Sequence, residues 1–472
     1  MEIMEIGMRT AAEYTQKEMT TVLIACCAGI FITPLMSTMM NLALVPIGVH
    51  FDVGSHSLAM VNTIFLLASV VTMVPFARLS DIYGRKRILI LGLVTILVAS
   101  IIAASSPTFE ILLIMRFFMG VGAAAMSVSS MAMLTEVFPI HKRGWAIGIQ
   151  STFVYLGVAV GPALGGFMSD AIGWRSLFYF IIPFATVSLF VISRFKKEIK
   201  THEGSRMDIK GAAAYGSAIM LTMYGAINLP ELWAIVCILV GLVVLVLFIM
   251  MMRRTESPVL DLKVFGYSVF TRSCISAFMN YASSYSVSFF MALYLQSIGA
   301  LTPSQAGMVM LIQPIVQVAL TAKFGSYSDK LGDKRVLPTI GMVLTCVAVL
   351  MIIFLDISMD LRYVAVILIL LGLGYALFSA PNTNVIMSSV PPSNRGEAAG
   401  MIAVVRQTGM MVSMAIAMCS IILIMGSTDN LDPSNYDEFM EVIKAAFVIC
   451  LGMCVVGTFF SWFRGNDGPV SK

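Results

Sequence analysis

The sequence predicts an all-α membrane protein with fourteen transmembrane helices. Of its 472 residues, 58% are hydrophobic and only 12% are charged, and the mean hydropathy is +0.91, whereas soluble domains carry about 25% charged residues. Apolar runs about as long as the roughly 20 residues that cross a bilayer also recur along the whole chain. Because lipid offers no partners to backbone polar groups, such runs must be helices. This composition excludes disordered, collagen-like and disulfide-scaffold proteins.

Short polar segments separate fourteen apolar runs, taken here in chain order. They lie near 20–47, 57–77, 88–105, 108–133, 145–167, 175–193, 210–228, 232–252, 270–297, 304–324, 337–355, 362–388, 397–425 and 440–463. An even number of spans places both termini on the same side of the membrane. The polar first residues have no signal-peptide features, so we expect the first run to remain in the protein.

The distribution of Lys and Arg predicts which side that is. With the termini in the cytoplasm, only Arg175, Arg362 and Lys444 of the 30 basic residues lie outside, and two more lie within spans. The opposite orientation would place most of them outside, against the positive-inside bias. We therefore expect both termini to be cytoplasmic. The net charge of +4 is too small to indicate a nucleic-acid partner.

Two loop segments recur about half a chain apart. Residues 77–87 match 325–335 at five of eleven positions with an offset of 248, and Pro139 with 143–148 returns as Pro391 with 395–400 at an offset of 252. The matched residues include Asp, Arg, Gly and Pro rather than the common apolar types. The offset spans eight helices, an even number, so the two halves keep the same orientation. Such a parallel repeat is a transporter design with its site between the halves near the midplane.

The repeat predicts three parts of the chain. Residues 1–200 form an N-terminal six-helix bundle, 201–265 an inserted two-helix hairpin with its linker, and 266–472 a C-terminal six-helix bundle.

Three groups of residues resemble motifs of one transport family. The loop from Asp81 to Arg87 is similar to its loop motif between spans two and three, and Arg116 with Gly120 is similar to its intramembrane arginine motif. The run from Gly157 to Gly166 is similar to its antiporter motif. On these residues the chain resembles the major facilitator superfamily, in particular its fourteen-spanner drug:H+ antiporters of the EmrB/QacA type.

This resemblance implies a secondary transporter, not an enzyme, that exports small amphipathic molecules across a prokaryotic inner membrane by alternating access. It implies the lipid bilayer and a small-molecule substrate as partners, protons as the coupling ion, no cofactor and a monomer. A competing hypothesis is a transport-dead relative that acts as a sensor or scaffold, and the absence of a soluble signalling domain disfavours it.

Two sets of residues are predicted to control the movement of the halves. The gating set comprises Asp81, Gly84, Arg85, Asp329, Gly332, Arg143 and Arg395. The alternative for its basic members is simple anchoring of the loops in the cytoplasm. The helix-packing set comprises Gly157, Gly161, Pro162 and Gly165. Its glycines recur every four residues, so they line one helix face and permit close contact with a neighbour, while Pro162 can kink the helix.

Two arginines lie inside predicted spans, where a charge is costly and indicates a functional site. Arg116 and Arg406 are each about 13 Å deep, near the middle of a roughly 30 Å core. Other polar or distinctive residues of the spans complete the predicted substrate cavity: Met36, Asn41, Gln150, Tyr155, Asn280, Tyr285, Gln313, Gln317 and Asn382. Each of these alone is equally consistent with helix–helix hydrogen bonding.

Met36 occupies the position where the resembling drug:proton antiporters carry an acidic residue. None of the 26 acidic residues is expected in mid-membrane, although proton-coupled pumps need a titrating group there. A core with two arginines and no carboxylate favours anions. The alternative function is therefore transport of an anionic or zwitterionic metabolite or lipid without proton coupling. A metal site is not expected, and the eight cysteines are interpreted as small buried apolar residues.

Overall fold

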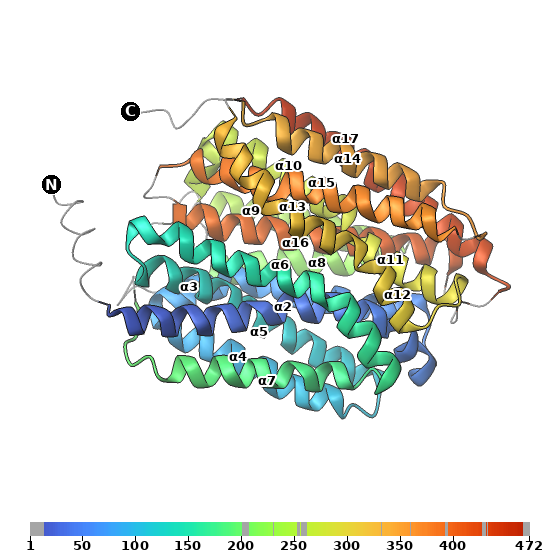
Figure 1. Ribbon diagram of the computed structural model, residues 1–472, viewed down its shortest axis with the longest axis horizontal. Helices are drawn as coiled ribbons and strands as arrows, with labels where there is room; N and C mark the ends of the chain where they lie inside the picture. Colours follow the sequence, from blue (N-terminus) through green and yellow to red (C-terminus); the bar gives the residue numbers. More distant parts are fainter. Residues whose placement is uncertain are drawn as a thin grey trace.

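The protein folds into a bundle of helices that run side by side (Figure 1). The computed structural model describes residues 14–200, 207–229, 231–252, 255, 262–331, 333–358, 360–391, 395–426, 431 and 433–465. No β-strand occurs in these ranges. The first described helix begins, and the last one ends, at the left of Figure 1. We call this the near end of the bundle and the opposite end the far end.

The N-terminal half contains six long helices. They are α2 (Gln16–Phe51), α3 (Ser55–Tyr83), α4 (Arg85–Ala104), α5 (Phe109–Val137), α6 (Ile140–Ala171) and α7 (Ser176–Ser193). A capping box starts α2, because Thr15 and Glu18 satisfy each other's backbone N–H groups. The Thr108 hydroxyl likewise accepts from the N–H of Ile111 at the start of α5.

Two helices follow this half and pack against each other. They are α8 (Ile209–Ile227) and α9 (Leu232–Met252). Gly225 of α8 lies directly against the carbonyl of Ala234, and Gly241 of α9 lies against Thr222, so missing side chains allow the close approach. The Tyr215 hydroxyl donates to the Val70 carbonyl at 3.0 Å, which attaches α8 to α3.

The C-terminal half begins after the 3₁₀ turn η1 (Leu262–Gly266). Its elements are α10 (Ser268–Ser284), α11 (Ser286–Leu293), the π-helical turn η2 (Tyr294–Ile298), α12 (Pro303–Met310), α13 (Ile312–Lys330), α14 (Val336–Ile353), α15 (Leu361–Ser388), α16 (Arg395–Met425) and α17 (Tyr436–Trp462).

Two of the expected spans are interrupted in this half. The run 270–297 is broken at Tyr285, where the N–H of Ser286 donates to the Ser413 hydroxyl of α16 at 3.0 Å. The run 304–324 is broken at Leu311, just before Pro314, whose ring nitrogen cannot donate a helical hydrogen bond.

Twelve helices of the described residues are long and apolar enough to cross a membrane, with α12 and α13 counted as one crossing. This number differs from the fourteen expected spans. The segments α8 and α10–α11 are outside the twelve, because α10 has 17 residues and α11 has eight. The α8 helix is long enough at 19 residues, but it carries Lys, Ser, Thr, Tyr and several glycines and is therefore less apolar.

The sequence repeat is also a repeat of helix contacts. Between α4 and α5, Gly92 lies against the Gly122 carbonyl, and between α14 and α15, Gly341 lies against the Gly374 carbonyl; a Cβ at either position would be 2.7 Å from that oxygen. The two pairs are separated by 249 and 252 residues, as the loop motifs are. The two halves therefore use the same positions for the same helix pairs.

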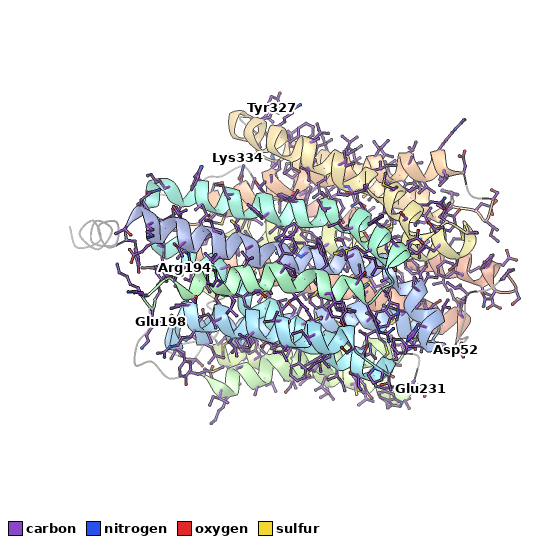
Figure 2. All side chains as sticks on the ribbon, turned by 60° about the horizontal axis from the view of Figure 1, so that its bottom comes forward. Asp52, Arg194, Glu198, Glu231, Tyr327 and Lys334 are labelled. Atoms are coloured by element: carbon purple, nitrogen blue, oxygen red, sulfur yellow. The ribbon has the colours of Figure 1, made fainter. Side chains whose placement is uncertain are left out.

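Charged groups lie at the two ends of the bundle. Figure 2 shows Arg194, Glu198 and Lys334 at the near end and Asp52 and Glu231 at the far end. The near end carries the loop between α3 and α4, which contains the first copy of the repeated motif.

Candidate translocation site

Arg116 is fully buried and lies within a polar network of three helices. Its Nε donates to the Val61 carbonyl at 3.1 Å, and its Nη2 donates to Asn62 Oδ1 at 3.3 Å. Asn62 Nδ2 in turn donates to Asn41 Oδ1 at 2.7 Å. The guanidinium also lies 4.6 Å from the centre of the Phe65 ring. The network thus joins α5, α3 and α2 inside the N-terminal half.

The charge of Arg116 has no carboxylate partner among the described residues, and its Nη1 has no hydrogen-bond acceptor there. A neutral amide, a carbonyl and a ring compensate a buried cation only in part. Met36, which is 1% exposed, contributes a thioether and no charge. The acidic residues nearest the spans lie at helix ends: Glu110 in the first turn of α5, Glu136 near Arg85, and Asp170 exposed near the end of α6. The centre of this half is therefore electropositive.

Polar contacts join the two halves at mid-depth. They are Ser37 Oγ with the Tyr285 hydroxyl at 2.6 Å, Gln407 Nε2 to Ser69 Oγ at 3.0 Å, the Tyr155 hydroxyl with Ser379 Oγ at 3.1 Å, and Thr63 Oγ1 to Met418 Sδ at 3.1 Å. Two of the predicted cavity residues, Tyr155 and Tyr285, thus bond to the opposite half. We call the four contacts the seam. Hydrogen bonds between neutral groups are individually weak, so the two halves can separate along this seam and close again.

Backbone contacts hold the halves together at the far end. Gly307 of α12 lies against the Pro162 carbonyl of α6, at 2.5 Å from the position a Cβ would occupy, and Gly166 lies against the Pro303 carbonyl. Near the opposite end, Gly148 of α6 and Gly400 of α16 have no atom of the described residues within 4 Å of that position. The far end of the seam is therefore the tightly packed one.

The predicted helix-packing face contacts α2. Gly157 lies against the Phe31 carbonyl, 2.8 Å from its Cβ position, Gly161 lies against Thr38, and Gly165 lies against the Met39 backbone at 2.7 Å. Gly409 makes the equivalent contact in the other half, against the Phe278 carbonyl at 2.8 Å. Because a side chain would collide with backbone atoms of α2 at Gly157 and Gly165 and with the Thr38 side chain at Gly161, these glycines fix how closely α6 and α2 approach.

Two predicted cavity residues are instead engaged within the C-terminal half. Asn280 is fully buried, and its Nδ2 donates to Met342 Sδ at 3.1 Å. Asn382 donates to the Ser273 carbonyl at 3.2 Å and accepts from Arg464 Nη1 at 2.6 Å. Asn382 therefore lies in a structural network at the near end of the bundle.

The other predicted cavity residues lie on helices that border the seam. Gln150 and Gln317 are buried at 6% and 8% exposure, on α6 and α13. Gln313 is partly buried, and its carbonyl lies against Gly372. Arg406 is partly buried on α16, one turn before Gly409, which packs against Tyr281. Arg116 and Arg406 thus lie in different halves.

The first copy of the gating motif forms a compact charged cluster. Arg85 donates to Asp81 at 3.0 Å through Nη2 and to the Ala132 carbonyl at 2.7 Å through Nη1, and Glu136 lies 3.6 Å from it. Gly84 has a φ of +117°, which disfavours other residues. Its Cα faces the carboxylate of Glu198, which accepts from the N–H of Lys86 at 2.9 Å.

The second copy is described only in part. Gly332 lies outside the described residues, as do the side chains of Asp329 and Arg395. In this copy Asp333 stands where the first copy has Arg85, and it forms an ion pair with Arg335 at 2.8 Å. Of the other predicted gating residues, Arg143 donates to the Phe138 carbonyl at 2.9 Å and so fixes the start of α6.

Sequence reasoning missed several of these residues. Ser37, Ser69, Ser379 and Gln407 supply the opposite sides of the seam contacts, and single serines in apolar runs carry no pattern that would single them out. Arg464, which follows the last apolar run of the sequence, is also buried, at 1% exposure. It donates to Lys334 O at 2.9 Å and to Asn382, which ties the end of α17 to α15.

The comparisons with known proteins agree with this architecture. The model of the Major Facilitator Superfamily matches residues 26–272 and 273–472. The riboflavin transporter RibZ of Clostridioides difficile is 27% identical over 96% of this chain and 100% of its own length. The multidrug resistance protein Stp of Mycobacterium tuberculosis is 30% identical over 84% of this chain and 74% of its own length.

Solved structures share the fold at low identity. A POT family transporter in complex with a thioalcohol-conjugated peptide has a TM-score of 0.71 at 13% identity, covering 94% of this chain and 96% of that one. A bacterial homologue of the lysosomal transporter Spinster, inward-facing and unoccupied, has a TM-score of 0.66 at 15% identity, covering 96% and 98%. These proteins are transporters and not enzymes. With its family match, its multi-pass helices and its two matched halves, the chain belongs to the major facilitator superfamily.

Proposed function

We propose that the protein is a secondary transporter that exports small amphipathic molecules across the inner membrane of a bacterium by alternating access. The single observation that carries this proposal is the polar seam between the halves, which passes close to Arg116, a buried arginine without a carboxylate partner in the described part of the chain. The halves are tightly packed at the far end of the seam. A rocking movement of one half against the other would open the far end and close the near end. Similarity to a riboflavin transporter and to a multidrug resistance protein supports small, amphipathic cargo.

We further propose fourteen crossings with both termini cytoplasmic, divided at 200 and 265 into two six-helix bundles and an inserted hairpin. In this arrangement α8 and the broken α10–α11 segment cross the membrane beside the twelve more apolar spans. The contacts of α8 support this, because α8 packs closely against α9 at Gly225 and Gly241 and is hydrogen-bonded to α3 through Tyr215. The basic loop residues gather at the near end, which supports a cytoplasmic near end. The structure would then be the state open toward the cytoplasm.

A second candidate is transport of an anionic or zwitterionic substrate without proton coupling. The specific observation in its favour is the composition of the core: Arg116 and Arg406 contribute charge, and Met36 stands where an acid would be expected. The Nη1 group of Arg116 has no acceptor among the described residues. An anion that enters the seam would accept a charge-assisted hydrogen bond from it. A lipophilic cation would meet no opposite charge there.

One experiment separates the two candidates. The purified protein is reconstituted in liposomes that contain a pH-sensitive dye, and cationic, neutral and anionic amphiphiles are presented under an imposed pH gradient. Proton flux driven by a lipophilic cation would support drug:proton export and would contradict the electropositive site. Movement of anions alone, without proton flux and lost in Arg116→Gln, would support the second candidate. Movement of no compound in any arm would contradict both.

A further inference from the structure

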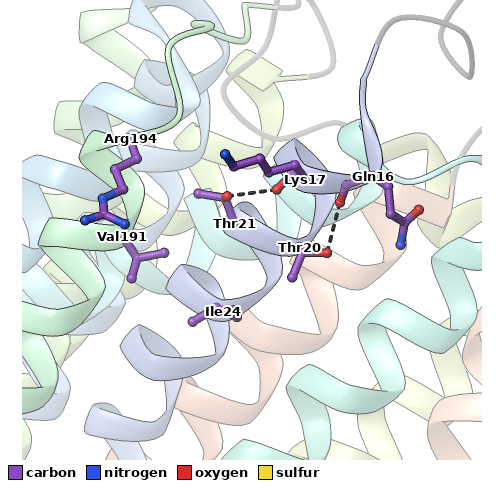
Figure 3. A pocket seen from close by; sticks show the side chains of 7 residues that line it. All are labelled: Gln16, Lys17, Thr20, Thr21, Ile24, Val191 and Arg194. Carbon is purple, nitrogen blue, oxygen red and sulfur yellow. Dashed lines mark hydrogen bonds between the residues drawn. The ribbon is translucent and has the colours of Figure 1, made fainter.

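A groove lies between the first turns of α2 and the end of α7 (Figure 3). Its volume is about 420 Å³, and it is lined by Gln16, Lys17, Thr20, Thr21, Ile24, Val191 and Arg194. Figure 3 shows Lys17 on α2 and Arg194 on α7, on opposite sides of the groove, with the apolar side chains of Ile24 and Val191 farther along the same two helices, away from the near end. The groove is remote from Arg116 and from the seam, so the transport site does not account for it.

The length of α7 places this groove relative to the bilayer. Its 18 residues rise about 27 Å, close to the roughly 30 Å of the hydrocarbon core. Its two ends therefore lie near the two edges of that core. Trp174 and Arg175 precede the helix at the far end, where Trp174 is buried and the Arg175 guanidinium lies 4.3 Å from the centre of its ring. At the near end, Arg194 lies at the level of the lipid headgroups.

The groove combines positive charge above with apolar surface below. The guanidinium of Arg194 lies 4.2 Å from the centre of the Phe190 ring, and Phe190 is 57% exposed. Ile24 is 49% exposed on the facing side of α2. Along α7, Val191 precedes Arg194 by three residues, and along α2, Ile24 follows Lys17 by seven. One to two turns of helix thus separate the basic residues from the apolar side chains, as a phospholipid requires.

No carboxylate of the described residues forms an ion pair with Lys17 or Arg194. Thr20 and Thr21 donate their hydroxyl hydrogens to the carbonyls of Gln16 and Lys17 at 2.9 and 2.8 Å, so they are not donors to a ligand. The nearby carboxylate, Glu18, accepts from the N–H of Thr15 at 2.8 Å and pairs with Lys197 at 3.5 Å. It does not line the groove.

We propose that this groove binds one anionic phospholipid, with its phosphate between Lys17 and Arg194 and an acyl chain along Ile24 and Val191. The apolar floor selects a lipid over a soluble anion, and the paired cations select a negatively charged headgroup. Basic pockets between helices at a membrane surface are suited to such headgroups. The proposal concerns a site on the lipid-facing side of the bundle and holds whichever substrate the seam carries.

Native mass spectrometry of the purified protein with phosphatidylglycerol tests the proposal. The variant Lys17→Gln with Arg194→Gln is compared with Lys142→Gln with Lys210→Gln, which removes two exposed near-end charges that do not line the groove. Because a basic residue near the membrane contributes about fivefold to lipid affinity, the groove variant should bind about 30-fold more weakly. The control variant should bind as the wild type does. Equal loss in both variants would indicate general surface attraction and would overturn the proposal.

Two further arms make the result specific. The charge-preserving variant Lys17→Arg with Arg194→Lys should retain binding, which shows that a loss in the glutamine variant is not caused by misfolding. Phosphatidylcholine should be retained less well than phosphatidylglycerol by the wild type. Displacement of phosphatidylglycerol by millimolar inorganic phosphate would identify a free-anion site and overturn the lipid assignment. Each measurement is of binding alone, so failure of transport would leave its outcome unaffected.

Discussion

The Ser37 and Tyr285 side chains are hydrogen-bonded to each other at 2.6 Å and are 248 residues apart in the chain. That separation equals the offset of the repeated loop motif. The glycine contacts of the two halves, at Phe31 and Phe278, give an offset of 247 for the same helices, so the two residues are equivalent to within one position. Equivalent residues can touch only beside the axis that relates the halves. This bond therefore marks the axis about which the halves would rock.

Tyr285→Phe should shift the protein toward the state that is open at the far end, because it removes a bond between the halves and leaves the ring in place. A hydrogen bond contributes about 1 kcal/mol net, which corresponds to a shift of about fivefold in the population ratio. The measurement is the distance between spin labels at positions 49 and 308, in a background without native cysteines. Tyr294→Phe is the control, since Tyr294 donates to Asp356 O within one half. An equal shift in both variants would contradict the prediction.

Arg116→Gln should reduce the initial rate of transport at least about tenfold, because the substrate loses a buried charged donor. Arg116→Lys should not restore the rate, since an ammonium cannot reproduce the planar geometry that reaches Val61 and Asn62. Arg464→Gln is the matched control: it also removes a buried arginine, but one held by Asn382 and Lys334. It should lower thermal stability while leaving the relative rates of different substrates unchanged. A wild-type rate in Arg116→Gln would refute the role of Arg116.

Gly161→Ala should destabilise the protein by about 1–3 kcal/mol, because its methyl group would collide with Thr38 of α2. Gly148→Ala, on the same helix, should be neutral or slightly stabilising, because no atom in the described ranges lies within 4 Å of its Cβ position and alanine favours the helix. Thermal unfolding in detergent compares the two variants directly. Equal thermal stability of the two variants would contradict the prediction, because it would show that α2 and α6 can move apart without loss of stability.

The ion pair between Asp333 and Arg335 should make the connection between α13 and α14 sensitive to acid. The hydrogen bond from Arg335 holds the pKa of Asp333 below its ordinary value of 3.8. A carboxyl group with a lower pKa in the folded state stabilises the fold above its unfolded pKa and loses this effect as the pH falls through the folded value. Asp333→Asn should cost less than about 1 kcal/mol at neutral pH, because the pair is partly exposed. The difference in melting temperature from the wild type should shrink below about pH 4; a difference independent of pH would exclude the ion pair as its cause.

The helical fold, the repeat and Arg116 could be predicted from the sequence because each depends on a local pattern. Long apolar runs require helices in lipid, and a charge inside such a run stands out. The interruption at Leu311 also had a local signal, Pro314. The interruption at Tyr285 had none, because the cause is Ser413 on a helix more than a hundred residues away.

The partners of the site residues required the tertiary structure. An amide in an apolar run is unusual and places Asn382 among the candidate cavity residues, but its hydrogen bond from Arg464, just after the last helix, has no signal in the sequence. The serines of the seam are too small and too common to be noticed in a sequence. Tyr155 and Tyr285 were noticed, but their contacts across the seam depend on the rotation of each helix, which the sequence alone leaves open.

The short α7 helix has a consequence for the kind of bilayer that suits this protein. It rises about 27 Å between Arg175 and Arg194, while α2 beside it has 36 residues and rises about 54 Å. A long helix adapts to thickness by tilting, but a short one bounded by two cations cannot lengthen. A thicker membrane would pull those cations toward hydrocarbon or force nearby lipid to thin. The short length of α7 thus favours thin bilayers, in which hydrophobic mismatch at this helix is small.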